Sequence, residues 1–288
     1  MEALKRDYST TAAAHGDPTM QTIDLTGRRL AFSCSGQGYP VVVLETGLGA
    51  ESSEWIPVQR GVEEFTRVCR YDRAGRGASD RAPSPRNAAD MIEDLHHLLH
   101  AAAVVGPYVL VGHSFGGLLM RLYAKRHCRD VAGLVLVDAM HEDQFDVFGN
   151  MFPPPMPTDN LALQQTRAFW AGGWRKVEST TEHIDLESSI RQVRQVVSLG
   201  DLPVHVITAG TFINQPLVPA AHRAELQRRW DDLQKQFLKL SSRATRSTVP
   251  GSGHFVQRDD PQAVITAIER IVEQARTLRD DHLQVGYQ

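Results

Sequence analysis

The seven residues VGHSFGG at positions 111–117 place a serine where a buried strand turns sharply into a helix. The letters YVLVG that lead into the turn form an apolar run, and LLMRLYAKRH after it is typical of a helix. Gly112, Ser114 and Gly116 match G-x-S-x-G, in which the glycines permit a tight turn and the serine hydroxyl is exposed. The stretch therefore predicts an α/β sheet with Ser114 as a nucleophile at a strand end, rather than a purely structural turn.

Strand and helix patterns alternate along the rest of the chain. Continuous apolar runs such as VAGLVLV indicate strands buried on both faces, and recurring apolar residues at 88–103 indicate a helix. Asp260 followed by Pro261 is typical of a helix start. The alternation predicts a mostly parallel sheet covered by helices. Strands are expected within 21–36 (a hairpin), 39–45, 66–72, 107–112, 131–139, 202–210 and 243–255, and further helices at 118–127, 219–240 and from 260.

Composition favours small-molecule chemistry. The chain has 288 residues, 42% hydrophobic content and a formal charge of −3, so a large core is expected and neither nucleic acid nor a membrane is an expected partner. No 18-residue apolar run and no hydrophobic signal core are present, which favours a cytoplasmic location. Cys34, Cys69 and Cys128 are widely spaced, so each is expected as a buried small hydrophobic residue without disulfide or zinc. Oligomeric state is not indicated.

A serine hydroxyl needs a base to remove its proton, so the turn requires a histidine within reach. His254 lies in GSGHF after the last expected strand, where the strand ends of an open α/β sheet meet at one crevice. His113 adjoins Ser114, but neighbours on a sharp turn point in different directions, which favours a packing or supporting role. His205 lies inside an expected strand and is expected as a hydrogen-bonded core residue. The base is therefore assigned to His254.

Residues 140–202 separate two expected sheet strands that a short connection would be able to join. The segment is rich in aromatic residues and methionine around PPPMP, which predicts a cap. Its apolar side chains either form the small core of the cap or together roof an apolar pocket. They are Phe145, Phe148, Met151, Phe152, Met156, Phe169, Trp170 and Trp174.

Five segments, ETGLGAESSEW, RYDRAGRGASD, VGHSFGG, LVLVDAMHED and GSGHFVQRDDP, resemble the α/β-hydrolase superfamily in order and spacing. The resemblance covers residues 21–277. It implies an α/β fold with an eight-stranded, mostly parallel sheet flanked by helices, a helical cap after the sixth strand, and the chain order serine, acid, histidine. The expected organisation is a flexible arm at 1–20, a core of 21–139 and 203–288, and the cap at 140–202.

The resemblance also implies an oxyanion hole in the loop after VVVL. Matching ETGLG to the family's His-Gly-x segment places the backbone N–H of Leu48 toward the developing oxyanion. The second donor is the N–H of Phe115, directly after Ser114. Thr46 stands where the family usually has histidine. Because the donors are backbone groups, this departure changes the support of the loop rather than removing the hole.

The resemblance requires an acid, which most superfamily members carry just after the seventh strand. Residues 202–224 contain no Asp or Glu, so that position is empty here. A minority arrangement, found in some haloalkane dehalogenases, places the acid after the sixth strand, where this chain has Asp138. Asp138 is therefore assigned as the acid that orients His254, with Glu142 and Asp143 as the alternatives.

Other motifs favour structural roles. GRGASD at 75–80 lacks the third glycine of a dinucleotide fingerprint. HHLLH at 96–100 and MHED at 140–143 contain metal-capable side chains without H-E-x-x-H spacing or converging ligands. No cofactor and no metal are therefore expected. Arg73 and Arg76 are expected to fasten their loop, with Asp72 as a partner.

These features predict a serine hydrolase that cleaves a carboxylic ester or lactone through an acyl-enzyme. Cofactor-free perhydrolases and carbon–carbon bond hydrolases use the same triad, and a non-catalytic ligand receptor can share the fold, so these alternatives stay open. The segments LETGLG, YDRAGRGAS, VDAMHEDQ and GSGHF resemble the branch that includes serine-dependent macrolide esterases of antibiotic resistance. The expected partner is a small hydrophobic ester or lactone, with a macrolide lactone as a candidate.

Overall fold

The strands of the computed structural model form one sheet, and the structure describes residues 19–149, 151–152, 154–211 and 220–285. The strand order is β1-β2-β4-β3-β5-β6-β7-β8. β2 is antiparallel to its two neighbours, and all other neighbouring strands are parallel. The expected eight-stranded, mostly parallel sheet is confirmed. The strands are β1 (Gln21–Asp24), β2 (Arg29–Ser35), β3 (Val41–Glu45), β4 (Val68–Tyr71), β5 (Tyr108–His113), β6 (Val131–Val137), β7 (Val204–Thr211) and β8 (Ala244–Gly253).

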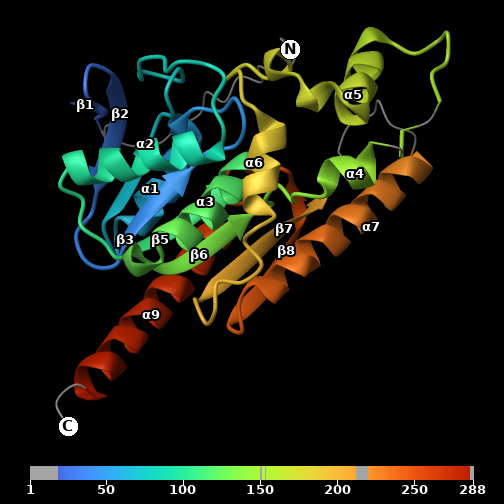
Figure 1. Cartoon of the computed structure of the whole chain (residues 1–288). Helices are drawn as coiled ribbons and strands as arrows, with labels where there is room; N and C mark the ends of the chain where they lie inside the picture. The colour runs from blue at the N-terminus through green and yellow to red at the C-terminus, as the bar shows by residue number, and fades with distance from the viewer. Residues whose placement is uncertain (1–18, 150, 153, 212–219, 286–288) are drawn as a thin grey trace, which may run out of the picture.

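Helices cover both faces of this sheet (Figure 1). The helices α2 (Ala88–Ala101), α3 (Phe115–Arg126) and α6 (Leu186–Val193) share one hydrophobic core, and α1 (Ile56–Val62) and α9 (Pro261–Val285) share the other. The other helical segments are η1 (Ser52–Trp55), η2 (Cys128–Asp130), α4 (Gln144–Phe148), α5 (Leu161–Ala171), η3 (Gly173–Arg175), η4 (Val177–Ser179), α7 (Ala220–Gln236), η5 (Phe237–Leu240) and α8 (Val256–Asp259). The expected arm at 1–20 lies almost wholly outside the described residues.

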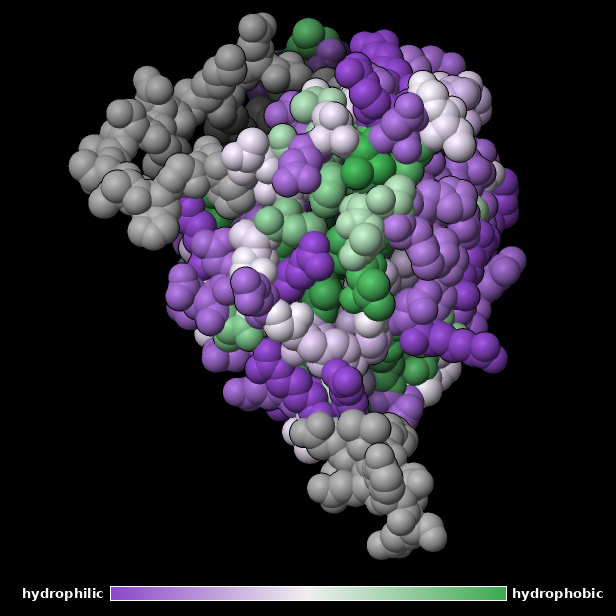
Figure 2. Space-filling view, turned by 90° about the vertical axis from the view of Figure 1, so that its left-hand side faces the viewer, coloured by the Kyte–Doolittle hydropathy of each residue, from purple (hydrophilic) through white to green (hydrophobic). Residues whose placement is uncertain are grey.

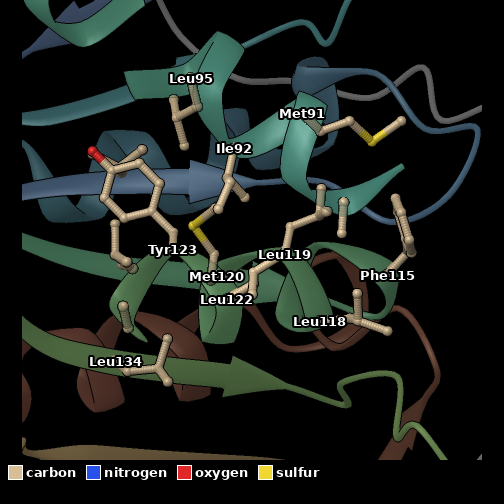
Figure 3. Packing of buried hydrophobic residues seen from close by; sticks show 14 of the residues in the cluster. Met91, Ile92, Leu95, Phe115, Leu118, Leu119, Met120, Leu122, Tyr123 and Leu134 are labelled. Carbon is tan, nitrogen blue, oxygen red and sulfur yellow. The ribbon is translucent and has the colours of Figure 1, made fainter. Parts of the chain in front are cut away.

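The two cores explain why the central strands are apolar throughout. Successive side chains of a strand point to opposite faces. Val43 belongs to the core with α2 and α3, whereas Val42 belongs to the core with α1 and α9. Figure 3 shows the first of these cores, in which side chains of α2 and α3, among them Ile92 and Met120, lie close together. The carboxyl ends of the central strands are therefore held on a rigid support.

The insertion between β6 and β7 contains α4, α5 and α6, as the sequence leads one to expect of residues 140–202. Its last part is fastened to the core. Ser189 Oγ of α6 accepts a 2.9 Å hydrogen bond from the N–H of Ala88, and Ile184 forms a parallel β-bridge with Arg86. These contacts fix the end of the insertion against the start of α2.

Cys69 is buried as expected, but the expectation that the cysteines form no disulfide is wrong. Cys34 and Cys69 form a disulfide, and Cys128 is exposed rather than buried. The two partners are 35 residues apart in the chain, but they lie directly opposite each other on the antiparallel strands β2 and β4, with Cα atoms 4.1 Å apart. Strand pairing, which spacing does not reveal, brings them together. The cytoplasmic location stays a prediction.

The face at the left of Figure 1 carries both hydrophilic and hydrophobic residues. Figure 2 shows, on the face at the left of Figure 1, a band of hydrophobic residues bordered by hydrophilic ones. Within the described ranges, no helix combines the length and the apolar character needed to cross a bilayer.

Candidate active site

Ser114 occupies the turn between β5 and α3 with an unusual backbone conformation, φ 51° and ψ −121°. Positive φ is costly for a residue with a side chain and persists only where the surroundings enforce it. Here the N–H of Ser114 donates to the carbonyl of Val137 (3.1 Å), and its own carbonyl accepts from the N–H of Met140 (2.8 Å). A Cβ atom on Gly112 would lie 2.5 Å from the carbonyl oxygen of Gly116, so the turn needs glycine there. The expected sharp turn is present.

Asp138 follows β6 directly and is completely buried. Its Oδ2 accepts a 2.7 Å hydrogen bond from Nδ1 of His254. Its Oδ1 accepts from the backbone N–H of Ala209 (2.9 Å) and from Nε1 of Trp230 (2.7 Å). These three donors fix both oxygens of the carboxylate. Because Nδ1 of His254 donates to Asp138, the lone pair of the imidazole is on the other ring nitrogen, Nε2.

His254 lies in the loop between β8 and α8, with its side chain 24% exposed. His113, which directly precedes Ser114, donates from Nε2 to the backbone carbonyl of His254 at 2.8 Å, and the two rings lie 4.7 Å apart. Burial lowers the pKa of His113 well below its usual value, and the nearby His254 lowers it further. His113 is therefore neutral and fastens the His254 loop beside the Ser114 turn, a supporting role consistent with expectation.

The loop after β3 lies against the same turn. A Cβ atom on Gly47 would be 2.9 Å from Nδ1 of His113 and 3.4 Å from Cβ of Ser114. Leu48 follows in this loop, and Phe115 is the first residue of α3, where backbone N–H groups have no partner within the helix. Leu48 therefore follows a residue that lies against Ser114, and Phe115 follows Ser114 itself. The role of their N–H groups as oxyanion donors stays a prediction.

The chain matches the alpha/beta hydrolase family over residues 41–267, a range that includes Ser114, Asp138 and His254. This match covers most of the chain. The chain belongs to the alpha/beta hydrolase family.

The relatives of this chain differ in the share of their own length that aligns with it. It is 30% identical over 305 aligned residues to efuK of Hormonema carpetanum, named a probable transporter, covering 89% of this chain but 43% of that protein. It is 26% identical to the uncharacterized protein YqjL of Bacillus subtilis, covering 81% and 83% of the two chains. A solved esterase of Thermogutta terrifontis has a TM-score of 0.57 at 17% identity, covering 89% of this chain and 99% of that one. At this low identity, the similarity to the esterase shows a shared fold only.

The two alternative acids of this hydrolase are paired elsewhere. Glu142 makes hydrogen bonds of 2.5 and 2.9 Å with the guanidinium of Arg121. Burial opposes ionisation of Glu142, but the hydrogen bonds and charge of Arg121 outweigh it and lower the pKa to about 2. Asp143 forms a 2.9 Å ion pair with Arg194 at the surface. Of the three candidate acids, the structure thus pairs Asp138 with His254.

Arg73 and Arg76, which were expected to fasten their own loop, instead bind the loop that carries Leu48. Nη1 and Nη2 of Arg73 donate to the carbonyls of Thr46 (2.7 Å) and Gly47 (2.6 Å), and Arg76 donates to the carbonyl of Gly49. Asp72, the partner expected for these arginines, instead accepts backbone N–H groups of residues 52 and 78. The arginine contacts take over the support of a loop that lacks the family's usual histidine.

Two carboxylates that sequence reasoning missed share the Arg73 guanidinium. Glu45, at the end of β3, is 2.5 Å from Nη1, and Glu182, in the insertion, is 2.7 Å from Nη2. Glu182 Oε1 also accepts a 2.6 Å hydrogen bond from the N–H of Gly49. Burial raises the pKa of Glu45. Burial also opposes ionisation of Glu182, but the charge and hydrogen bonds of Arg73 outweigh it, so the pKa of Glu182 is lowered. The position of Glu45 directly after an apolar run was the one sequence signal of a buried charge here. No sequence feature marked Glu182 as its companion.

The aromatic residues of the insertion pack largely on one another. Phe145 stacks on Trp174 at 4.4 Å and 9°, and Phe148 meets the edge of Trp170 at 5.4 Å. Phe145 and Trp174 belong to the core that contains α2 and α3, and Phe148 clusters with side chains of α7, so these three rings do not form a separate core of the insertion. Phe148 also stacks on Trp230, the residue that donates to Asp138, which links the insertion to the acid. That aromatic side chains of the insertion roof an apolar pocket stays a prediction.

His205 has the core role expected of it. Its ring nitrogens lie 2.8 Å from the hydroxyl of Thr245 and 2.9 Å from the hydroxyl of Ser247 on the neighbouring strand. Burial lowers its pKa to about 4, with a smaller contribution from the charge of Arg270. The histidine is thus a neutral, hydrogen-bonded part of the sheet.

Proposed function

We propose that this alpha/beta hydrolase cleaves carboxylic esters or lactones through an acyl-enzyme intermediate on Ser114. The observation that carries the proposal is the 2.7 Å hydrogen bond between the buried Asp138 carboxylate and His254, whose loop is fastened to the residue preceding Ser114. A serine turn with such an acid and histidine beside it is the arrangement used for nucleophilic acyl transfer.

In the first half of the reaction, Nε2 of His254 takes the proton of the Ser114 hydroxyl while its oxygen attacks the carbonyl carbon. Asp138 keeps the imidazole oriented and stabilises its protonated form. The N–H groups of Leu48 and Phe115 bind the oxygen that becomes negative. When the carbon–oxygen bond of the ester breaks, His254 returns the proton to the departing alcohol, and the acyl group stays on Ser114.

In the second half, water takes the place of the alcohol. His254 takes a proton from this water, whose oxygen attacks the acyl carbon under the same oxyanion donors. The bond to Ser114 then breaks, the carboxylic acid departs, and the proton returns to the serine oxygen. In a lactone the alcohol and the acid belong to one molecule, so the product is the ring-opened hydroxy acid.

The substrate class rests on two further features. Phe169 and Trp170 of the insertion are only partly buried, and as the proposed roof of an apolar pocket they would favour a bulky hydrophobic acyl or lactone group over a short acetyl group. The resemblance of the motif segments to serine-dependent macrolide esterases makes a macrolide lactone the first large substrate to test. The ligand we propose is a small hydrophobic ester or lactone.

A substrate panel tests the proposal. The purified protein is incubated with p-nitrophenyl esters of rising chain length, simple lactones and several macrolides, and products are followed by mass spectrometry. We expect longer esters to be cleaved faster than acetate, no turnover by Ser114→Ala, and labelling of Ser114 by a fluorophosphonate. Addition of one water to a macrolide would establish the lactone substrate, whereas macrolides left intact beside cleaved esters would indicate a general carboxylesterase. No hydrolysis of any activated ester would overturn the proposal.

A further inference from the structure

A cluster of metal-capable side chains lies outside the candidate active site. His96 comes from α2, His127 follows the last residue of α3, and Asp130 ends η2. One ligand atom of each residue can be chosen so that all three atoms lie within 4.8 Å of one another. Because α3 begins directly after Ser114 and runs away from it, and β6 begins directly after Asp130, the cluster lies at the opposite ends of the strands from Ser114.

The donor set fits a transition metal. Two imidazole nitrogens and a carboxylate are ligands typical of zinc and related divalent ions. A second carboxylate is close, since Oε1 of Glu93 lies 3.3 Å from Nε2 of His127. The rings of His96 and His127 are stacked at 4.1 Å and 14°, so the two imidazoles lie next to each other although they come from different helical segments.

The imidazoles are held in a form that can bind metal. Nδ1 of His96 lies 3.2 Å from the hydroxyl of Tyr123, a contact of the kind that orients ligand histidines and leaves the other nitrogen for the metal. Nε2 of His127 is buried, and apart from the contact with Glu93 it has no polar partner within the described part of the chain.

The sequence gives no hint of this convergence, because HHLLH lies 27 or more residues before the other ligands. The packing of α3 on α2 brings them together. Stacked histidines also occur where side chains only pack together, so metal binding has to be measured directly.

We propose that His96, His127 and Asp130, with Glu93 as a fourth ligand, bind a divalent transition metal of the Zn²⁺ class. The ion joins α2 to the end of α3 and stabilises that part of the fold. It takes no part in ester cleavage, because the proposed catalytic groups lie at the other ends of the strands.

Zinc titration of the full-length, chelator-treated and dialysed protein tests the site. Calorimetry should show one bound Zn²⁺ per chain, and Tm should rise by about 5 °C at a zinc concentration of about 100 times Kd. His96→Gln, His127→Gln and Asp130→Asn should each weaken binding by about tenfold or more. His97→Gln is the matched control, because His97 is exposed on the same helix, and its affinity should equal that of the wild type.

Circular dichroism of the metal-free variants separates lost ligands from lost folding, and Asp130→Asn keeps the shape of its side chain. Absence of zinc binding, or unchanged affinity in folded His96 and His127 variants, would overturn the proposal. Binding lost only in His254→Gln would place zinc on the catalytic imidazole and overturn it as well. Chelation should leave ester turnover by the wild type unchanged; a loss restored by zinc would contradict a purely structural ion.

Discussion

At the residue scale, Asp138 uses its two carboxylate oxygens for different partners. One oxygen faces His254, and the other accepts two donors that come from β7 and α7. The residue has a φ of 42°, so its side chain reaches this position only because the backbone is held in an unfavourable conformation. Backbone strain therefore occurs at both the proposed nucleophile and the proposed acid, as is common at functional sites.

The first prediction concerns this acid. Asp138→Asn should lower kcat by about 10⁴-fold, because an amide no longer fixes the required tautomer or stabilises the imidazolium. The measurement is steady-state hydrolysis of the best p-nitrophenyl ester. Asp143→Asn, which alters a surface ion pair with Arg194, is the control and should leave kcat unchanged. Reversed effects of the two substitutions would transfer the role to Asp143.

The second prediction concerns Trp230, which lies in α7, within the helix expected at 219–240. Trp230→Phe removes the donor to Oδ1 of Asp138 while keeping an aromatic ring against Phe148. A hydrogen bond to a charged group is worth about 1.5–3 kcal/mol, so kcat should fall about tenfold or more with KM unchanged. Trp174→Phe removes a buried indole of the insertion and serves as the control, with kcat unaffected. An equal fall in both variants would indicate lost packing instead of lost positioning.

At the scale of elements, the pairing of β7 with β8 has a pH-dependent stability. The pKa of His205 is about 4 in the fold, compared with about 6.5 in an unfolded chain. As pH falls through this window the unfolded state gains a proton that the folded state does not, so stability decreases. Between about pH 7 and about pH 5 this histidine should remove about 2 kcal/mol from the free energy of unfolding.

Urea unfolding at the two pH values checks this third prediction. His205→Gln should reduce the loss of stability on acidification by about 2 kcal/mol. His97→Gln, at an exposed histidine, should show the same pH dependence as the wild type. If His205→Gln loses as much stability as the wild type, burial of this ring does not control the effect.

The elements themselves were largely predictable, because apolar runs and helix signals are local. Asp260, for example, accepts a 3.0 Å hydrogen bond from the N–H of Ala263 at the start of α9, as its sequence context suggests. Long-range pairing was not predictable. The disulfide depends on the register of β2 with β4, and Trp230 reaches Asp138 across 92 residues. The absence of Asp and Glu from residues 202–224 pointed to Asp138 as the acid. No local pattern, however, marks a residue whose partner lies in another helix or strand.

At the scale of the whole molecule, the insertion and the core meet at one buried charge cluster. Glu182 of the insertion binds both the guanidinium of Arg73 and the N–H of Gly49, in the loop that carries Leu48. Through Arg73 it is also connected to Glu45 at the end of β3. Movement of the insertion would therefore be transmitted to the proposed oxyanion hole, although the insertion supplies none of the proposed catalytic groups.

The fourth prediction is that Glu182→Gln lowers both stability and turnover. Removing one charge of a buried ion pair typically costs about 3–5 kcal/mol, and the amide presents a donor where Arg73 also donates. The loop should then lose its fixed position, and a displacement of about 1 Å can reduce kcat by about 10²-fold. Ester hydrolysis and urea unfolding measure the two effects.

Glu187→Gln is the matched control for this substitution, because Glu187 lies in the same insertion but pairs with Arg175 and Arg191 at the surface. An exposed pair contributes about 0–1 kcal/mol, so both kcat and stability should remain close to those of the wild type. If Glu182→Gln loses stability but keeps full kcat under conditions in which it is folded, the cluster supports the fold alone. If kcat falls while KM stays constant, the insertion positions the oxyanion donors through Glu182, as the shared contacts of Arg73 and Gly49 require.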